Sequence, residues 1–588
     1  MRNSANSPVE VLQASKKQGV RYFFLIAMKV VAILALLQFT NPDIMDRVNL
    51  LLDNDRYATL LPYIAIWCLS LMVLMIAAFQ PQSIWRWSWA ILLSLSAATA
   101  WGYRFASHNE LSAYDILSLW EARHEVSRAS QMYAKSIYMG FGVFFASLAI
   151  LGFGPVVQGT RLRKWLTRLV WTPLIPIVVI AGIVFYKSGG GSQALPVQFT
   201  SLSLGALTGY HLAVRPSVSR HEVAWTPKAE NRIEKIVFLV DESIRADYVS
   251  LVPENVFTPR FAAAGKNLID YGRATSGGNC SHYSEATLRF MVNPSNVVTS
   301  ATTNPTMWDY ALKAGYRTVF VDGHTGTVST ASEMQNFMTL NERRKIGSFI
   351  GLHKLKGEDA DDKVLKIIVE ELAKPGPVFI FANKNGAHFP YDSAYKLSEA
   401  QFRPSIAEAG ADTPQSRVNS YLNAVVWTVD RLMPGFIAAA ESNKAAFIYT
   451  SDHGQIVQPG GLTHCQVDNP DPRTALVPLM LDLPPGPQRQ LYVDAAVRLK
   501  DKANHYMIAP TVLSFMGYDS ADVQTVYKSS LLMQDGNFKP SFTTGDIFGL
   551  FSDEVKWNPI DVSKDMLEAP AKAILDGSAG KHASSTTN

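Results

Sequence analysis

The stretch Ile236-Val-Phe-Leu-Val-Asp-Glu-Ser243 decides the fold of the second half of this 588-residue chain. Five apolar residues run directly into two adjacent carboxylates. A short, continuous apolar run of this kind predicts a strand that is buried on both faces, as in a parallel sheet. Ligands of open α/β sheets gather beyond the carboxyl ends of the strands. We therefore expect the chemistry of the protein at Asp241 and Glu242.

Two later stretches repeat the pattern of an apolar run followed by ligating side chains. Residues 446–450 lead into Asp452 and His453, and residues 378–382 lead to His388. Carboxylates and histidines are donor types that zinc accepts in proteins. Because these residues follow three strands of one expected sheet, the sequence predicts a zinc site at its edge.

Short apolar runs alternate with helical patterns from residue 233 onward, and a helical periodicity covers residues 415–440. This alternation predicts an α/β domain with a mostly parallel sheet and helices on both faces. From residue 552 the chain becomes polar and rich in small residues, so we expect a disordered tail over 552–588. The candidate strands are residues 236–240, 317–321, 378–382, 446–450 and 476–482.

The first third of the chain is strongly apolar. The whole chain is 48% hydrophobic and 18% charged, between soluble and membrane classes, and its formal charge of +4 argues against a nucleic-acid binder. Five segments approach the roughly 20 residues that span hydrocarbon as a helix. We therefore predict an α-helical membrane domain of five transmembrane helices over residues 1–186. The segments are 22–39, 58–79, 84–103, 137–157 and 169–186.

Flanking charges orient these spans. Basic residues precede the first segment between Lys16 and Arg21, and others follow the fourth between Arg161 and Arg168. The first and third connections are acidic instead. By the positive-inside rule the N-terminus is cytoplasmic, and five spans leave the C-terminal domain outside. Lys29 lies within the first span, where it either has a functional role or snorkels to the inner interface.

Residues 187–232 are expected to form a linker. It opens with the flexible sequence Lys187-Ser-Gly-Gly-Gly-Ser192. Residues 199–214 are apolar again but carry Ser, Gly and His, which favours an interfacial helix over a sixth span. The long connection 104–135 is either an amphipathic helix on the outer membrane surface or a solvated helical hairpin.

Residues 275–290 supply a candidate nucleophile. A glycine-bearing loop precedes a helix that we expect to open near Ser284. A hydroxyl at a helix N-terminus lies where backbone N–H groups favour an anion such as phosphate. A zinc-bound serine hydroxyl loses its proton more easily and becomes a usable nucleophile. The alternative is that Ser284 only caps the helix.

Three cysteines are too few for a disulfide scaffold or a four-thiolate zinc site. Cys68 lies in an apolar segment, which leaves Cys280 and Cys465 as the pair outside the membrane. Each lies in a loop that must approach the metal, so we predict a disulfide between them. The alternative is that both thiols are free and Cys280 is a small packing residue.

The order of five spans and four motifs resembles the membrane-bound phosphoethanolamine transferases, which belong to the alkaline phosphatase and sulfatase superfamily. The resemblance covers about residues 20–550. It implies a sulfatase-like catalytic domain over 233–551, on the periplasmic side of a bacterial inner membrane. The motifs are Val-Asp-Glu-Ser-Ile-Arg-Ala-Asp (240–247), Asn-Cys-Ser-His-Tyr-Ser (279–284), Asn-Gly-Ala-His (385–388) and Ser-Asp-His-Gly (451–454).

The resemblance also assigns roles to individual residues. It implies that Glu242, Asp452 and His453 bind zinc. Ser284 takes the position of the nucleophile and further zinc ligand, where the family usually has threonine. Asp241 is then a capping or supporting carboxylate, and the cofactor is one or two zinc ions. Four histidines would contact the substrate or a second zinc, namely His388, His464, His282 and His324. As alternatives, His282 could be a solvated loop residue and His464 a surface residue.

The implied reaction is transfer of phosphoethanolamine from phosphatidylethanolamine to lipid A, a core sugar or a periplasmic glycan, through a covalent intermediate on Ser284. Three departures from the family pattern leave the acceptor open. Phe290 replaces a second cysteine, Gln455 replaces an acidic residue, and no lysine stands between Thr325 and Ser332.

Other functions remain as alternatives. One is a phosphoglycerol transferase of the lipoteichoic acid synthase type, and another is a non-catalytic membrane scaffold or sensor. An ordinary sulfatase is disfavoured, because Cys280-Ser-His-Tyr-Ser lacks the Cys/Ser-x-Pro-x-Arg sequence that formylglycine formation requires.

Overall fold

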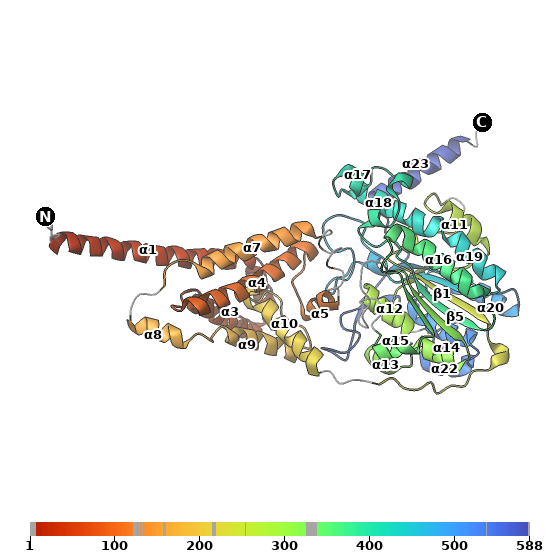
Figure 1. The fold of residues 1–588 in the computed structure, drawn as a ribbon, viewed down its shortest axis with the longest axis horizontal. Helices are drawn as coiled ribbons and strands as arrows, with labels where there is room; N and C mark the ends of the chain where they lie inside the picture. The colour runs from red at the N-terminus through yellow and green to blue at the C-terminus, as the bar shows by residue number, and fades with distance from the viewer. Residues whose placement is uncertain are drawn as a thin grey trace. The chain divides into compact units, whose positions relative to one another are not determined.

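The computed structural model describes residues 8–585 and divides the chain into two compact units. The first unit comprises residues 1–118 and 133–215, and the second comprises residues 119–132 and 216–588. Figure 1 traces the chain through both. The description leaves out residues 122–125, 127–129, 131–132, 157–159, 215–218, 253–254, 325–337, 535 and 537.

The described part of the first unit is helical (Figure 1). Three helices contain stretches long and apolar enough to cross a membrane, at Val20–Thr40, Tyr57–Ala78 and Ala134–Gly152. The predicted segments 84–103 and 169–186 also form helices. The first, α4 (Ser83–Ser107), does not meet this measure of length and hydropathy, and the second, α9 (Leu174–Tyr186), has only 13 residues. Three of the five predicted spans are therefore supported by length and composition, and the other two stay predictions. The helices are α1 (Pro8–Thr40), α2 (Ile44–Asp53), α3 (Tyr57–Ala78), α4 (Ser83–Ser107), α5 (Ala113–Glu121), α7 (Ala134–Gly152), α8 (Thr160–Arg168), α9 (Leu174–Tyr186) and α10 (Val197–Val214).

Two details of this unit bear on the sequence interpretation. Lys29 is buried, and its Nζ donates to the carbonyls of Ala78 and Phe153, both at 2.7 Å. It therefore caps the C-terminal ends of α3 and α7, and whether this position lies at the inner interface stays a prediction. α10 packs against α4 and α9 through a face that includes Phe199 and Leu204. Its placement relative to a membrane stays a prediction.

The second unit is built on a seven-stranded sheet in the order β2-β7-β6-β1-β5-β3-β4 (Figure 1). The five strands from β6 to β4 are mutually parallel, and β7 runs antiparallel to both of its neighbours. The mostly parallel α/β sheet that the sequence predicts is confirmed. The strands are β1 (Lys235–Asp241), β2 (Ile269–Thr275), β3 (Arg317–Asp322), β4 (Ser348–Gly351), β5 (Val378–Asn383), β6 (Ala446–Ser451) and β7 (Leu476–Asp482).

Helices cover both faces of this sheet. One core includes side chains of α12 (Ser281–Arg289), α13 (Val297–Thr303), α14 (Met307–Lys313), α20 (Pro487–Leu499), α21 (Ile508–Phe515) and α22 (Ser520–Tyr527). The other core includes side chains of α11 (Pro259–Ala264), α16 (Gly357–Ala373), α18 (Pro414–Val425) and α19 (Met433–Ser442). Two further short helices are α15 (Leu340–Lys345) and α17 (Ile406–Ala409).

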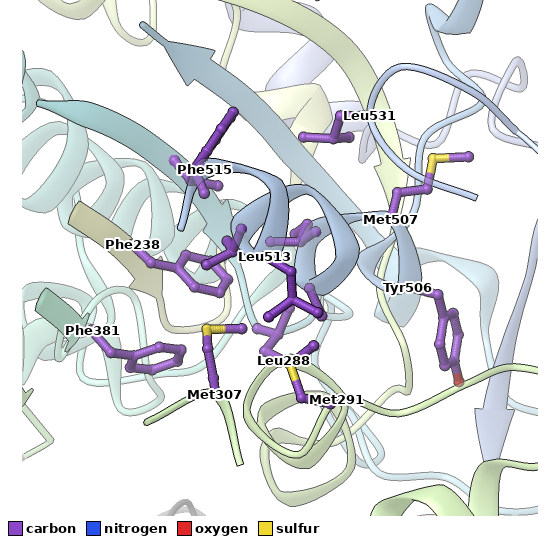
Figure 2. Packing of buried hydrophobic residues seen from close by; sticks show 14 of the residues in the cluster. Phe238, Leu288, Met291, Met307, Phe381, Tyr506, Met507, Leu513, Phe515 and Leu531 are labelled. Carbon is purple, nitrogen blue, oxygen red and sulfur yellow. The ribbon is translucent and has the colours of Figure 1, made fainter. Parts of the chain in front are cut away.

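The side chains of β1 supply both cores in alternation. Phe238 packs in the first core, where its ring centroid lies 4.9 Å from that of Phe381 (Figure 2), and Leu239 packs in the second. Successive residues of a strand face opposite sides, so a continuous apolar run fills two cores. By the same alternation Asp241 and Glu242 point to opposite faces at the strand end.

Residues 552–588 are predicted as a disordered tail, but the described part of this segment, up to residue 585, contains a strand and a helix, which corrects the prediction there. β9 (Lys556–Pro559) pairs antiparallel with β8 (Ser541–Thr544), and α23 (Ala569–Ser585) follows. Composition gave the wrong prediction here because only a few residues of this polar segment pack against the domain. One of them is Glu568, whose side chain is fully buried.

Candidate metal centre

Glu242, Asp452 and His453 converge at the carboxyl ends of β1 and β6. Asp241 and Ser451 are register partners in these parallel strands, so the residues that follow them meet. One ligand atom from each of the three residues lies within 4.8 Å of the others, and all three residues are buried. The structure thus brings together the three ligands expected from strand ends.

The carboxylates of Glu242 and Asp452 lie close together, and their negative charges are not fully compensated. Asp452 Oδ1 accepts from the backbone N–H groups of Ser243 (2.9 Å) and His453 (2.6 Å). Its Oδ2 is buried and has no hydrogen-bond partner among the described residues. Burial and the nearby charge of Glu242 raise the pKa of Asp452 well above its usual value. Two buried like charges at this distance call for a cation between them.

The imidazole of His453 is oriented to donate its lone pair to that cation. Nδ1 lies 2.7 Å from the carbonyl oxygen of Gly454, which can only accept, so Nδ1 carries the proton. Nε2 then faces Glu242 Oε1 at 3.6 Å and Asp452 Oδ2 at 3.4 Å. Burial lowers the pKa of His453, which favours the neutral form that binds metals. A backbone carbonyl that fixes the imidazole is typical of metal-ligating histidines.

A serine hydroxyl faces this cluster from α12. Ser281 is the first residue of the nine-residue helix, and its Oγ lies 3.0 Å from His453 Nε2 and 3.4 Å from Glu242 Oε2. The N-terminus of α12 directs its positive dipole end to the same space. Two carboxylates, one imidazole and one hydroxyl give four oxygen and nitrogen donors, a set that fits zinc.

Ser284, the predicted nucleophile and zinc ligand, faces elsewhere. Its Oγ donates to the carbonyl of Gly278 at 2.8 Å and accepts from the N–H of Gly278 at 3.2 Å. The predicted helix start near Ser284 is wrong, because α12 begins at Ser281. Ser284 therefore lies three residues into the helix, and Ser281 holds the position expected for it.

His324 reaches the cluster from the carboxyl end of β3. Its Nε2 lies 3.1 Å from Glu242 Oε2, and its Nδ1 lies 3.1 Å from Asp322 Oδ1. Burial alone would lower the pKa of His324, but these hydrogen bonds with Asp322 and Glu242 raise it well above its usual value. The imidazole thus holds the carboxylate of Glu242 in place.

The other three predicted histidines lie around the same cluster. The ring of His464 stacks on that of His453 with centroids 4.4 Å apart, and His388 lies 6.4 Å from His464. Burial, followed by the charge of His453, lowers the pKa of His464 well below its usual value. His282 is buried beside Tyr283, and burial lowers its pKa to about 3.

The predicted disulfide between Cys280 and Cys465 is present, with 4.6 Å between the Cα atoms. Two backbone contacts join the same loops, since Cys465 N donates to Asn279 O (2.9 Å) and Asn279 Nδ2 donates to Gln466 O (2.7 Å). The bridge therefore ties the loop that precedes Ser281 to the loop that carries His464.

Asp241 points to the opposite face and supports the centre from behind. Its Oδ2 accepts from Lys384 Nζ at 2.7 Å and from the Tyr449 hydroxyl at 3.1 Å. Burial raises the pKa of Asp241 to about 6, although Lys384 opposes the shift. Lys384 also donates to the carbonyl of Thr428, at 2.6 Å, within a π-helical turn that leaves this carbonyl available. These contacts fit the interpretation of Asp241 as a supporting carboxylate.

Sequence reasoning missed three residues of this site: Ser281, Asp322 and Lys384. Signals for two of them existed, because Asp322 directly follows the apolar run of β3, and Lys384 follows that of β5 after Asn383. Ser281 follows Cys280 directly, but only the helix start identifies it as the residue that faces the cluster.

Comparisons with known proteins find several similar sequences and structures. Residues 234–518 match the sulfatase family model. The Kdo(2)-lipid A phosphoethanolamine 7''-transferase of Escherichia coli strain K12 is 26% identical over 182 residues, which cover 28% of this chain and 32% of that protein. The enzyme of that name from Salmonella typhimurium is 26% identical over 308 residues, which cover 48% and 52%. The matched regions thus span 32% and 52% of the length of these two curated relatives.

A solved structure extends the similarity to most of the chain. The integral membrane protein lipooligosaccharide phosphoethanolamine transferase A from Neisseria meningitidis superposes with a TM-score of 0.56 and 16% identity. The superposition covers 76% of this chain and 87% of that protein. At this identity the similarity establishes a shared fold.

Proposed function

Because residues 234–518 form a sulfatase-family domain, we propose that the chain is a phosphoethanolamine transferase of the alkaline phosphatase and sulfatase superfamily. It moves phosphoethanolamine from phosphatidylethanolamine to a lipid or glycan of the bacterial cell envelope. The similarity to the two Kdo(2)-lipid A phosphoethanolamine 7''-transferases supports the transferred group and the class of acceptor.

One observation carries this proposal: the hydroxyl of Ser281 stands at the start of α12, beside His453 Nε2 and Glu242 Oε2. A nucleophile for a phosphorus centre needs a nearby group that lowers its pKa and a positive environment for the phosphoryl oxygens. The cation site and the helix N-terminus supply both on the same side of Ser281. Ser281 is therefore the nucleophile, in place of Ser284.

Glu242, Asp452, His453 and Ser281 would hold zinc, which lowers the pKa of the bound hydroxyl and offsets charge on the phosphoryl oxygens. His324 keeps Glu242 in its orientation. Lys384 anchors Asp241, the residue that precedes Glu242, from the opposite face of the sheet. The positive end of the α12 dipole stabilises the negative phosphoryl oxygens.

The reaction is a double displacement. In the first half, Ser281 Oγ forms a bond to phosphorus, the bond to the diacylglycerol oxygen breaks, and the serine proton ends on the released diacylglycerol. In the second half, an acceptor oxygen attacks phosphorus and the Ser281 Oγ–P bond breaks. Ser281 then regains a proton from the acceptor.

His388 and His464 lie on the less buried side of the cluster, where a substrate headgroup would enter. An imidazole N–H there donates to a phosphoryl oxygen of the headgroup. His282 lies beside the disulfide and is the least suited of the four predicted histidines to touch the substrate. A second zinc would draw on His388 and His464.

A lipid donor explains why the domain follows a helical unit with apolar helices. In the proposed topology the N-terminus is cytoplasmic, the protein crosses the inner membrane several times, and the sulfatase-like domain works in the periplasm. This arrangement keeps Ser281 in the compartment that holds the outer-leaflet donor and the envelope acceptors.

Mass spectrometry of the trapped intermediate tests the proposal. Full-length protein in liposomes containing phosphatidylethanolamine should release diacylglycerol and carry a phosphoethanolamine adduct. Ser281 and Ser284 lie in one tryptic peptide, residues 274–289, so fragmentation must assign the adduct to Ser281. An adduct on Ser284 would reject the assigned nucleophile. An adduct formed only with phosphatidylglycerol would identify a phosphoglycerol transferase instead.

A further inference from the structure

Glu568 is a buried carboxylate that the proposed mechanism does not use. It lies beyond the residues matched to the sulfatase family, directly before α23. We infer that Glu568 is a positioning residue of the metal centre, which holds the two ligand-bearing loops together through Arg245. The inference rests on the proposed function only in its activity measurement.

Four donors converge on this one carboxylate. Oε1 accepts from Arg245 Nη1 at 2.6 Å, from Arg473 Nη1 at 3.1 Å and from the N–H of Val457 at 3.4 Å. Oε2 accepts from the Tyr248 hydroxyl at 2.6 Å. The residue is 2% exposed, so these contacts replace nearly all of its hydration. A carboxylate with four donors fixes the places of all of them.

Arg245 connects Glu568 with the loop that carries Glu242. Arg245 lies three positions after Glu242, and the side chain of Arg245 is fully buried. Its backbone N–H donates to the hydroxyl of Tyr421 at 3.0 Å, and that hydroxyl donates to the carbonyl of Ser243 at 2.9 Å. The segment between Glu242 and Arg245 is thus held at both ends.

The same guanidinium reaches the loop that carries Asp452 and His453. Arg245 Nη1 donates to the carbonyl of Gln455 at 3.3 Å, while the side chain of Gln455 donates back to the carbonyl of Ser243 at 3.2 Å. Because Glu568 also binds the N–H of Val457, it contacts both loops. Displacement of its carboxylate would therefore change the distances between Glu242, Asp452 and His453.

The contact between Glu568 and Arg245 depends on the negative charge of Glu568. Arg245 is also paired with Asp247, and Arg473 is paired with Asp471 at 2.7 Å. Burial would raise the pKa of Glu568, but Arg245 and the hydroxyl of Tyr248 hold it below its usual value. Removal of the negative charge would leave the buried guanidinium of Arg245 with fewer compensating charges, and the side chain would shift to recover them.

The test is Glu568→Gln in the full-length protein, because the amide keeps the shape and removes the charge. Zinc affinity is measured by competition with a chromogenic chelator, and site geometry by the absorption spectrum of the cobalt-substituted protein. We expect zinc binding to weaken by roughly 10–100-fold, as for other groups that orient ligands, with an altered cobalt spectrum. The kcat for headgroup transfer should fall with it, while KM for the lipid stays near that of wild type.

Asp565→Asn is the matched control. Asp565 lies in the same segment and pairs with Lys572 at 2.8 Å, but its side chain is 63% exposed. It undergoes the same chemical change without touching either ligand loop, so its zinc affinity, cobalt spectrum and turnover should equal those of wild type.

Wild-type zinc affinity and cobalt spectrum in folded Glu568→Gln protein would overturn the inference. If that variant does not fold, Tyr248→Phe replaces it, because it removes one hydrogen bond to the same carboxylate and keeps the ring. A threefold or larger loss of zinc affinity in Tyr248→Phe supports the inference, and unchanged affinity overturns it. If wild-type protein fails to transfer phosphoethanolamine while Glu568→Gln still weakens zinc binding, the proposed function fails and the positioning role stands.

Discussion

The hydroxyl oxygen of Ser281 lies 3.0 Å from Nε2 of His453, although 172 positions separate the two residues in the chain. The contact joins the start of α12 to the end of β6. It places the proposed nucleophile, a helix N-terminus and the imidazole of the candidate metal centre around one point, and the proposed attack on a phosphodiester needs this arrangement.

Ser281→Ala is expected to abolish phosphoethanolamine transfer and to leave the protein folded with zinc bound. Loss of the hydroxyl removes the attacking atom, while Glu242, Asp452 and His453 still supply three ligands. The rate should fall at least about 10³-fold, in the range seen when members of a catalytic unit are removed. Diacylglycerol release from phosphatidylethanolamine liposomes and metal analysis of the purified variant measure the two effects.

Ser284→Ala is the matched comparison on the same helix. It removes two hydrogen bonds with Gly278 and should cost about 1–3 kcal/mol of the free energy of unfolding, because buried backbone groups lose their partner. Transfer by the folded fraction should stay within a few-fold of wild type. The assignment of Ser281 is wrong if the two variants show the reverse pattern.

Zinc removal should inactivate the protein reversibly. Dialysis against a chelator is expected to abolish transfer and to lower the Tm, because a ligand that binds only the native state stabilises it by about 4 kcal/mol at 1,000 times its Kd. Added zinc should restore both. Asp452→Asn should reproduce the loss of zinc, since it removes the charge on the buried Oδ2. Full activity in metal-free protein would contradict the candidate metal centre.

The fold could be predicted from the sequence where a run of neighbouring residues indicates one kind of structural element. The apolar runs of β1, β3, β5 and β6 specify strands buried on both faces, and the strand ends identify Glu242, Asp452 and His453. β7 was found as a strand, but the sequence did not reveal that it runs antiparallel. Direction depends on the connections around a strand, which the apolar pattern of the strand itself does not encode.

The residues that could not be predicted act through contacts that are distant in the chain. Ser281 and Ser284 are both serines near a helix start, and a shift of three residues in that start exchanges their roles. Glu568 lies in a polar segment that composition assigns to disorder. Only the fold brings Glu568 to Arg245, 323 positions earlier, and no local pattern signals that contact.

The disulfide between Cys280 and Cys465 should be required for full activity, because it ties the loop before Ser281 to the loop of His464. Cys465→Ser is expected to cost about 2–5 kcal/mol of the free energy of unfolding and to lower transfer in the protein that remains folded. Circular dichroism melts and liposome assays measure both.

Cys68→Ser serves as the control for that variant, because Cys68 is a free, exposed cysteine of the helical unit. Its stability and transfer should equal those of wild type. Non-reduced wild-type protein should react with one equivalent of a maleimide after denaturation. Reaction with three equivalents would refute the disulfide.

Reporter fusions test the predicted topology. Fusion of a periplasmic reporter after Gly190, in the flexible linker, should be active, because five spans place that residue outside. Fusion after Arg168, in the basic connection that follows the fourth predicted span, should be active only with a cytoplasmic reporter. A preference for the cytoplasmic reporter at both positions would remove the fifth span and the periplasmic assignment of the sulfatase-like domain.

Gly386→Ala should displace Glu242 and weaken zinc binding. Gly386 has a φ of +56°, and a Cβ there would lie 2.4 Å from the carbonyl oxygen of Glu242 and 2.7 Å from Asp241 Oδ1. The left-handed conformation costs a non-glycine residue about 1–2 kcal/mol, and the clash adds to that cost because a backbone atom must move. Ala387 N donates to the same carbonyl at 2.9 Å, so the loop that carries His388 would shift as well.

Gly410→Ala is the control that separates the cost of the left-handed backbone conformation from the cost of the clash. Gly410 has a φ of +61°, and a Cβ there would meet no atom within 4 Å, so this variant suffers the conformational cost alone. We expect Gly410→Ala to lose about 1–2 kcal/mol of the free energy of unfolding and to keep wild-type zinc affinity and transfer. Gly386→Ala should lose more stability and, in addition, bind zinc at least about tenfold more weakly, as for other changes next to a metal ligand. Equal zinc affinity in the two variants would mean that the loop of His388 does not control the position of Glu242.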